Sequence, residues 1–386
     1  MLYDIWVKSR KGDLKKLRFR DWFIIFITSV LFISFITLPK IFHYRGLFDA
    51  ATWIIVFQPP FVLLFFVFNR ELRNTFEKSI SLILSLGLIF LLVGSLVWDY
   101  AVFIEPQRLV VREETINLSG DYENIKVVLI SDIHMGPIKD DEFLKKVIER
   151  LNTVANDELS KEEQIILLIP GDFVAGKFED AELLYPLGNL DEKYKTYAVL
   201  GNHDFDLFNN NSKEKVGDNG LYLADEVTRI LEENRVHVLR NESIEVNEGV
   251  YVAGVDDIWS TTADPRLTLA GLKEEDFIIY LGHNPDIVLD LESNDTLRNR
   301  VDLVATGHTH GGEIRLPTLG FTEKDTFTFV PLPILLGQEY DQGYFEYGIG
   351  SEDESTIPLY ITSGVGQTGT KARLFNPPEI VILMIE

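Results

Sequence analysis

Residues 303–312 read LVATGHTHGG, an apolar run followed at once by glycine, histidine and threonine. A short apolar run that ends in such a cluster is typical of a strand buried on both faces of a sheet. The pattern occurs four more times, so the chain beyond about residue 125 is predicted to hold at least five buried strands. These stretches are KVVLIS (126–131) before Asp132, IILLI (165–169) before Pro170-Gly171-Asp172, TYAVL (196–200) before Gly201-Asn202-His203-Asp204, and FIIYL (277–281) before Gly282-His283-Asn284.

Helical periodicity lies between these strands. Six apolar residues recur at helical spacing after an acidic start at 140–142: Phe143, Leu144, Val147, Ile148, Leu151 and Val154. Residues 224–234 form a second predicted helix. The alternation predicts an α/β fold, in which ligands lie beyond the carboxyl ends of the strands. All five polar clusters are expected there.

The histidines locate the chemistry, because five of the seven in the chain lie in these clusters: His134, His203, His283, His308 and His310. A single one would be most simply a hydrogen-bonded residue, but five together need a common cause. Metal binding supplies one, since neutral imidazole is the commonest metal ligand. In an extended chain residues i and i+2 share a face, so Asp132 is expected to converge with His134, and His308 with His310. Oxygen and nitrogen ligands without sulfur suit Mn²⁺, Fe or Zn²⁺, and the chain has no cysteine.

The ordered motifs Asp-x-His, Gly-Asp, Gly-Asn-His-Asp, Gly-His and Gly-His-x-His resemble those of the calcineurin-like metallophosphoesterases, over about residues 125–386. The stretch RLFNPPEI (373–380) resembles the membrane-associated bacterial branch of that family. The resemblance implies an α/β fold of the four-layer αββα sandwich type. It also implies hydrolysis of a phosphate monoester, diester or pyrophosphate bond by hydroxide bridging two metal ions, since paired ions lower the pKa of water from 15.7 towards about 7.

Carried over by position, the resemblance implies a role for each motif residue. Asp132, His134 and His310 hold one metal ion, Asn202, His283 and His308 hold the second, and Asp172 bridges the two. His203 faces the phosphate, where it stabilises developing charge or protonates the leaving group, and Asp204 orients His203. The sequence departs from the pattern at Ala175 and at Glu313, where a polar residue and a glutamine are more usual. We expect activity to fall in mild acid as the histidines take up protons.

The N-terminal region, residues 1–104, has a different character. It carries 12 Lys and Arg against 7 Asp and Glu. Three uncharged apolar runs lie in it, at 22–38, 50–68 and 79–98. Runs of about 17–25 apolar residues are typical of membrane-spanning helices, so this region is predicted to be a multi-pass membrane anchor, joined by a linker at 105–124 to the phosphoesterase domain.

Orientation follows from the Lys and Arg near each span. Three crossings with the N-terminus inside put ten of these residues in the cytoplasm and four outside, which places the catalytic domain outside the cytoplasm. The second run contains Gln58-Pro59-Pro60, and the orientation reverses if that run does not cross.

Residues 105–386 carry a net charge of −29, from 24 Lys and Arg and 53 Asp and Glu. This balance argues against nucleic-acid binding, because phosphate backbones need clustered positive charge. A membrane anchor beside a hydrolase favours a lipid-linked phosphate, and the family includes UDP-diacylglucosamine pyrophosphatases. Arg315 either meets a second phosphate or pairs with a carboxylate. The alternative function is a catalytically inert binding module at the membrane, although such relatives usually lack motif residues that are all present here.

Overall fold

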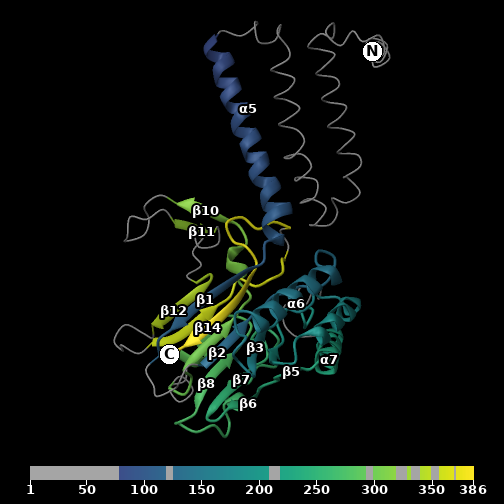
Figure 1. Cartoon of the computed structure of the whole chain (residues 1–386), viewed down its shortest axis with the longest axis vertical. Coiled ribbons are helices and arrows are strands. Elements are labelled where there is room, and N and C mark those ends of the chain that lie inside the picture. The colour runs from purple at the N-terminus through teal and green to yellow at the C-terminus, as the bar shows by residue number, and fades with distance from the viewer. Residues whose placement is uncertain are drawn as a thin grey trace. The chain divides into compact units, whose positions relative to one another are not determined.

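The computed structural model describes residues 78–118, 125–207, 218–292, 299–318, 328–331, 340–348, 356–368 and 371–386. The chain divides into two units, Met1–Val102 and Phe103–Glu386. Among the described residues of the first unit, Lys78–Asp99 form helix α5 (Figure 1). This helix covers the predicted run 79–98, whereas the predicted runs 22–38 and 50–68 lie outside the described residues.

The larger unit is built on two six-stranded sheets and a small β10–β11 hairpin (Arg315–Thr318 and Thr328–Pro331). In the first sheet β2 to β5 run parallel, β14 is antiparallel to β2, and β1 is parallel to β14. Its strands in spatial order are β1 (Val110–Ile116), β14 (Glu379–Ile385), β2 (Ile125–Leu129), β3 (Ile165–Pro170), β4 (Tyr194–Val199) and β5 (Val236–Val238). The last strand of the chain, β14, therefore lies between β1 and β2, next to the edge of this sheet (Figure 1).

The second sheet also has a parallel centre, but both of its edge strands are antiparallel to their neighbours. Strands β13, β9, β8 and β7 are parallel, while β12 and β6 run antiparallel at the two edges. Its strands in spatial order are β12 (Gly343–Gly348), β13 (Thr356–Ile361), β9 (Leu303–Thr306), β8 (Phe277–Leu281), β7 (Val250–Gly254) and β6 (Glu242–Asn247). The predicted strands 277–281 and 303–306 thus have the observed boundaries.

Alternation along the buried strands explains how the two sheets pack. In β8, Phe277, Ile279 and Leu281 enter the apolar layer between the sheets, while Ile278 and Tyr280 face the other way. In β3, Ile166 and Leu168 fill that same middle layer. A strand that is apolar on both faces needs cover on both, so each sheet also requires helices on its outer face.

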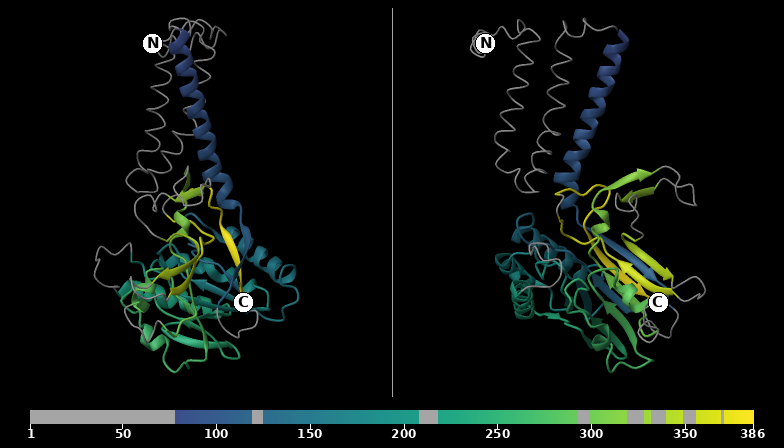
Figure 2. Two further views of the ribbon diagram at one scale, coloured as in Figure 1. Left: turned by 90° about the vertical axis from the view of Figure 1, so that its left-hand side faces the viewer. Right: turned by 180° about the vertical axis from the view of Figure 1, so that it is seen from behind.

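Helices supply this cover. The outer face of the first sheet packs in one core with α6 (Asp141–Asn156), the 3₁₀ segment Phe178–Asn189 and α7 (Asp218–Glu233), and Figure 2 shows α6 and α7 on the same side of that sheet. The second sheet packs similarly with α8 (Pro265–Thr268) and α9 (Ile287–Glu292). The predicted four-layer αββα sandwich is confirmed.

Helix α6 begins where the acidic start predicts. Asp140 Oδ1 accepts a hydrogen bond from the backbone N–H of Phe143 at 3.1 Å, which caps the helix. Helix α7 begins at Asp218, six residues before the predicted start at 224. The helix begins with Asp218-Asn219-Gly220, residue types that are common in turns. The sequence pattern therefore did not indicate the first turn of the helix.

The expected linker at 105–124 contains a strand. Val110–Ile116 form β1, which pairs in parallel with β14 along seven residues. Its sequence VVREETI places charged residues in the middle, and its residues are mostly half-exposed. An edge strand of this kind lacks the apolar run by which the buried strands were recognised.

Candidate functional site

The predicted residues gather where the two sheets meet. They lie in loops that directly follow β2, β3 and β4 of the first sheet and β8 and β9 of the second. The loops are Asp132–His134, Gly171-Asp172, Gly201–Asp204, Gly282-His283 and Gly307–His310. Because all five strands are parallel within their sheets, their carboxyl ends carry these loops to one place.

Backbone conformation turns these side chains inward. Five of the predicted residues have left-handed φ values: Asp132 (56°), His134 (50°), Asp172 (57°), His308 (70°) and His310 (52°). Asp and His adopt this region more readily than most residues, at a cost of about 1–3 kcal/mol each. We expected the Asp-x-His and His-x-His pairs to be extended, and the structure shows that they are not. They converge because both members of each pair sit in tight turns.

Two glycines allow the loops after β3 and β4 to touch. A Cβ on Gly201 would stand 2.2 Å from Asp172 Oδ1, and a Cβ on Gly171, whose φ is 83°, would stand 2.6 Å from Gly201 N. No side chain fits between these backbones, so only glycine lets Asp172 approach the Asn202-His203 segment this closely.

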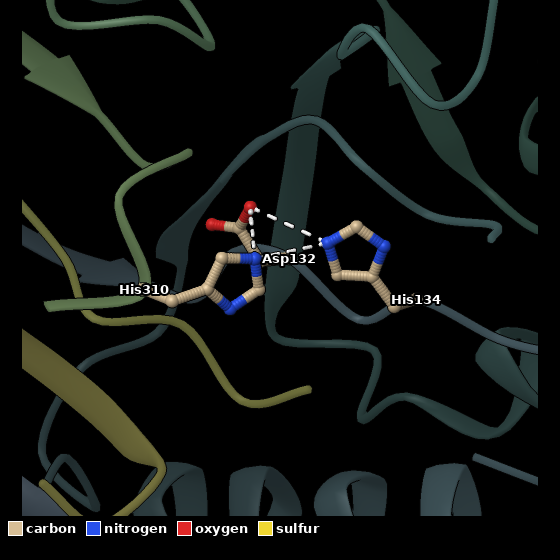
Figure 3. A group of neighbouring side chains, drawn as sticks. All are labelled: Asp132, His134 and His310. Carbon is tan, nitrogen blue, oxygen red and sulfur yellow. Dashed lines mark hydrogen bonds and ion pairs between the residues drawn. The ribbon is translucent and has the colours of Figure 1, made fainter. Parts of the chain in front are cut away.

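The first group of potential ligands is Asp132, His134 and His310. The Nε2 atoms of the two histidines lie 3.0 Å apart. Asp132 Oδ1 lies 3.8 Å from His134 Nε2 and 3.4 Å from His310 Nε2. Figure 3 shows the carboxylate and both rings pointing toward one another. All three side chains are buried, so their polar atoms face a common point inside the protein.

The second group is Asp172, His283 and His308. Asp172 Oδ2 lies 3.3 Å from His283 Nε2 and also 3.3 Å from His134 Nε2, so this one oxygen belongs to both groups. His283 Nε2 lies 3.1 Å from His308 Nδ1 and 3.0 Å from Asn202 Oδ1. All seven residues that the sequence implied as ligands therefore lie in one continuous cluster. Their assignment as ligands stays a prediction.

The chemistry of His283 fits a cation at this position. Its Nδ1 lies 2.7 Å from the carbonyl oxygen of Pro170, which can only accept, so Nδ1 carries the proton of the neutral ring. The lone pair on Nε2 then faces two further oxygens, Asp172 Oδ2 and Asn202 Oδ1. Such a contact repels unless a proton or a metal ion lies between the atoms. Burial acts to lower the pKa of His283, but the charges of Asp172 and Asp132 hold that pKa well above its usual value, so a positive charge at Nε2 is favoured. Metal-bound histidines commonly donate their other N–H to a carbonyl in this way.

Buried charges and orphaned atoms also fit divalent ions. Asp132 Oδ1 is buried and has no hydrogen-bond partner among the described residues. Burial acts to raise the pKa of Asp172, but the charges of His283, His203 and His134 hold the pKa well below its usual range, so the group is ionised. Burial lowers the pKa of His308 to about 4 and that of His310 well below its usual range, which leaves both rings neutral with free lone pairs. Oxygen and nitrogen donors of this kind suit Mn²⁺, Fe or Zn²⁺.

His203 lies at the edge of the cluster. Its ring centroid stands 4.7 Å from that of His134 in a T-shaped contact, and its backbone N–H donates to Asp172 Oδ1 at 2.9 Å. The side chain is only partly buried, unlike its neighbours His134 and Asp172. Burial lowers the pKa of His203 to about 4, against the attraction of Asp172. The His203 ring thus lies beside Asp172 and His134 and remains accessible from outside.

Asp204 holds the backbone of the neighbouring loop, while its expected role in orienting His203 stays a prediction. Its carboxylate accepts hydrogen bonds from four backbone N–H groups, those of Asp172, Phe173, Val174 and Gly201, at 2.9–3.1 Å. These bonds tie the loop after β3 to the loop after β4. Asp204 therefore fixes the backbone that carries Asp172, a role that no side-chain motif reveals.

Arg315 forms an ion pair with a carboxylate. Its Nη1 lies 2.5 Å from Asp341 Oδ2, and both side chains are largely buried. Of the two alternatives for Arg315, the structure shows the pairing with a carboxylate, that of Asp341. A substrate role for Arg315 would require this ion pair to open, and it stays a prediction.

Comparison with known proteins agrees with this geometry. The sequence pattern of the calcineurin-like phosphoesterases matches residues 125–312. A metallophosphoesterase of Aquifex aeolicus, described as uncharacterized, is 30% identical over 273 residues, covering 68% of this chain and 85% of the relative. This chain belongs to the calcineurin-like metallophosphoesterases. It is a metal-dependent phosphoesterase and hence a hydrolase.

Two further relatives come from bacteria. A Helicobacter pylori metallophosphoesterase is 26% identical over 316 residues, covering 80% of this chain and 72% of the relative. The UDP-2,3-diacylglucosamine pyrophosphatase LpxG of Chlamydia trachomatis is 27% identical over 326 residues, covering 75% of this chain and 92% of the relative.

The structure adds residues around the phosphoesterase site that the sequence analysis missed. Asp257 follows β7 and is buried near His283, with burial raising its pKa to about 6. Trp259, 45% exposed, makes a T-shaped contact with His308 at 4.8 Å between ring centroids. The run VYVAG before Val255-Asp256-Asp257 has the same form as the five recognised clusters, so this signal was present in the sequence.

A chain of hydrogen bonds reaches His310 from the start of the larger unit. The buried Glu105 carboxylate accepts from the backbone N–H groups of Phe375 and Asn376 at 2.9 and 2.8 Å. The amide Nδ2 of Asn376 donates to the carbonyl oxygen of His310 at 2.6 Å. Glu105 and Asn376 therefore support the loop that presents His310 to the cluster.

Proposed function

We propose that this phosphoesterase uses two divalent metal ions to hydrolyse a phosphate ester or pyrophosphate bond in a lipid-linked substrate at a membrane. One observation carries the two-metal part of the proposal. A single oxygen, Asp172 Oδ2, lies 3.3 Å from a histidine of each group, His134 and His283. A carboxylate shared in this way suits a pair of ions better than one.

The two groups would divide the ions between them. Asp132, His134 and His310 would hold one, Asn202, His283 and His308 would hold the other, and Asp172 would contact both. When bound, such ions neutralise phosphate charge and lower the pKa of water, which supplies a nucleophile at neutral pH. The positive charge is concentrated inside a region of net charge −29 (24 Lys and Arg, 53 Asp and Glu in residues 105–386), so the site attracts phosphate while the surrounding surface repels it.

His203 is the residue that we propose to act on the substrate directly. It lies beside Asp172 and His134 but is more exposed than either. From this position a ring N–H donates to a phosphate oxygen, which stabilises charge in the transition state or delivers a proton to the leaving group. The hydrogen bond from the backbone N–H of His203 to Asp172 Oδ1 holds the backbone of His203 next to the cluster.

Membrane anchoring is supported by one helical span among the described residues. Ser85–Gln107 is 23 residues long with a mean hydropathy of 2.0, which is long and apolar enough to cross a membrane. Large apolar side chains of helix α5 are exposed. Phe90, inside the span, is 77% exposed, and Leu82, just before it, is 60% exposed. Such a surface is stable in lipid and costly in water. A lipid-linked substrate follows from this anchor and from the substrate named for the relative LpxG.

Purified full-length protein tests the activity. With Mn²⁺ it is expected to hydrolyse at least one member of a panel containing a phospholipid monoester, an isoprenoid diphosphate and a nucleotide-linked lipid. Chelation should abolish turnover, and returning Mn²⁺ should restore it, because the bound ions are proposed to supply both the nucleophile and the charge that stabilises the phosphate. Turnover that survives chelation contradicts the metal requirement. Faster hydrolysis of short water-soluble esters than of every lipid contradicts the lipid-linked substrate.

The side of the membrane is a separate proposal, based on the Lys and Arg balance of the N-terminal region. We place the catalytic unit outside the cytoplasm and treat the anchor as multi-pass. The chain has no cysteine, so a single Glu192→Cys protein is expected to react with a membrane-impermeant maleimide in intact cells. Gly12→Cys is the matched control and should react only after the cells are opened. The reverse pattern would place the catalytic unit inside.

A further inference from the structure

A cavity of about 360 Å³ adjoins the proposed metal site through His308. Its walls include Asn284, Asp286 and Leu289 around the start of α9, and Tyr340 and Tyr347 around β12. Binding pockets for small organic molecules measure about 300–1,000 Å³. The cavity therefore has room for one ring system, next to the place where the substrate phosphate is proposed to bind.

One wall of the cavity offers a hydrogen-bond donor without an acceptor. Asn284 is only 3% exposed, and its Oδ1 accepts from the backbone N–H of Asp286 at 3.0 Å. That bond fixes the orientation of the amide, which leaves the NH₂ group as the unused end. Its Nδ2 has no hydrogen-bond partner among the residues that the structure describes. A buried donor of this kind is satisfied by a ligand that brings a carbonyl oxygen or a ring nitrogen.

The opposite wall is aromatic. The rings of Tyr340 and Tyr347 lie 5.7 Å apart at 54°, and the hydroxyl of Tyr347 donates to Glu292 Oε2 at 2.9 Å, which fixes that ring. Tyr340 also packs against Phe345 at 5.0 Å. Flat aromatic faces bind flat rings by stacking.

Charge excludes a second anion from the cavity. Asp286 lines it, and Glu292 is bonded to the Tyr347 hydroxyl at its wall. Neither Lys nor Arg lines it among the described residues. A phosphate or carboxylate would meet like charge there, so an anionic occupant is disfavoured.

The cavity is built together with the proposed ligand loop. Thr309 stands between His308 and His310, and its hydroxyl donates to the carbonyl oxygen of Asp341 at 2.5 Å. Asp341 follows Tyr340 and is held by the ion pair with Arg315. Tyr340 is thus fixed relative to His308, so a group in the cavity is bound in a set position relative to the phosphate.

We propose that this cavity binds an uncharged heteroaromatic ring that carries a hydrogen-bond acceptor, as the base of a nucleotide does. The proposal rests on the function proposed above, because the site around Asp172 places the phosphate to which that ring is joined. An acyl chain would fill the volume and leave the Asn284 donor without an acceptor. The preferred substrate is then a nucleotide-linked phosphate compound.

Direct binding to the full-length protein loaded with Mn²⁺ tests this inference. The probes are UMP, CMP, AMP and GMP, compared by calorimetry with ribose 5-phosphate, which has the same phosphate and sugar but no base. At least one nucleotide is expected to bind about tenfold or more tightly than ribose 5-phosphate, from stacking and one hydrogen bond. Equal affinities for all five compounds would overturn the proposal.

Two variants locate the effect. Asn284→Leu removes the donor and Tyr340→Ala removes the ring, and each is expected to bring the affinity of the preferred nucleotide down to that of ribose 5-phosphate. Tyr344→Ala is the matched control, because Tyr344 is 38% exposed and lies on the opposite face of β12 from Phe345 and Tyr347. A nucleotide preference that persists in both variants rejects the cavity as its source.

A parallel assay separates this proposal from the proposed function. Hydrolysis of bis(p-nitrophenyl) phosphate with Mn²⁺ reports on the metal site alone. Turnover without a nucleotide preference rejects the base-binding cavity and leaves the phosphoesterase mechanism intact. Absence of turnover rejects the mechanism, while the binding comparison still decides the cavity.

Discussion

Asp172→Asn is expected to lower the hydrolysis of bis(p-nitrophenyl) phosphate by about 10³-fold. The substitution keeps the size of the side chain but removes the charge shared by the two groups of potential ligands. Each group then holds a divalent ion more weakly, and paired ions contribute several kcal/mol to phosphoryl transfer. The measurements are kcat at saturating substrate and Mn²⁺, together with the metal content of the purified variant.

Glu192→Gln is the control for this change. It also removes one negative charge, but from an exposed position before β4, at the end of the strand opposite the site. It should leave both kcat and metal content at the wild-type level. If Asp172→Asn retained two metal ions and full activity, Asp172 would not bridge them.

His203→Ala is expected to lower kcat by about 10²–10⁴-fold, the range for loss of a positioned acid or base. Metal content should stay unchanged, because His203 is placed against the substrate and not among the ligands. This combination separates His203 from its neighbour His134, whose loss should lower metal content as well. The readouts are kcat and metal analysis of the same protein sample.

His237→Ala is the matched control, since His237 lies on β5 with 44% of its side chain exposed and contacts Tyr197 at the surface. An unchanged rate for His203→Ala with both ions bound would reject the proposed role of the ring. A loss of metal equal to that of His134→Ala would reassign His203 as a ligand.

The sequence predicted the buried part of this fold better than its edges. Strands β8 and β9 had the right boundaries because they are apolar on both faces and end in glycine-rich loops. The half-exposed strand β1 was assigned to a linker because charges interrupt it. Whether a half-polar segment joins a sheet depends on its partner, here the C-terminal strand β14, which lies more than 250 residues away in the chain.

The candidate site shows the same division between what motifs reveal and what only the fold reveals. Motif order was enough to bring Asp132, Asp172 and His308 to one place. The motifs did not reveal the left-handed turns that make the side chains converge, or the use of Asp204 by four backbone donors. They also left open whether Arg315 was paired, since Asp341 approaches it only through tertiary folding.

The hydrogen bonds that Glu105 accepts affect where the chain of this enzyme can be truncated. A fragment that begins at residue 108, just past the apolar helix, would keep every catalytic side chain and still lose the carboxylate that holds the Phe375-Asn376 backbone. The support behind His310 would then be missing. The stretch that follows the apolar helix is thus better regarded as a part of the enzyme's frame than as a tether.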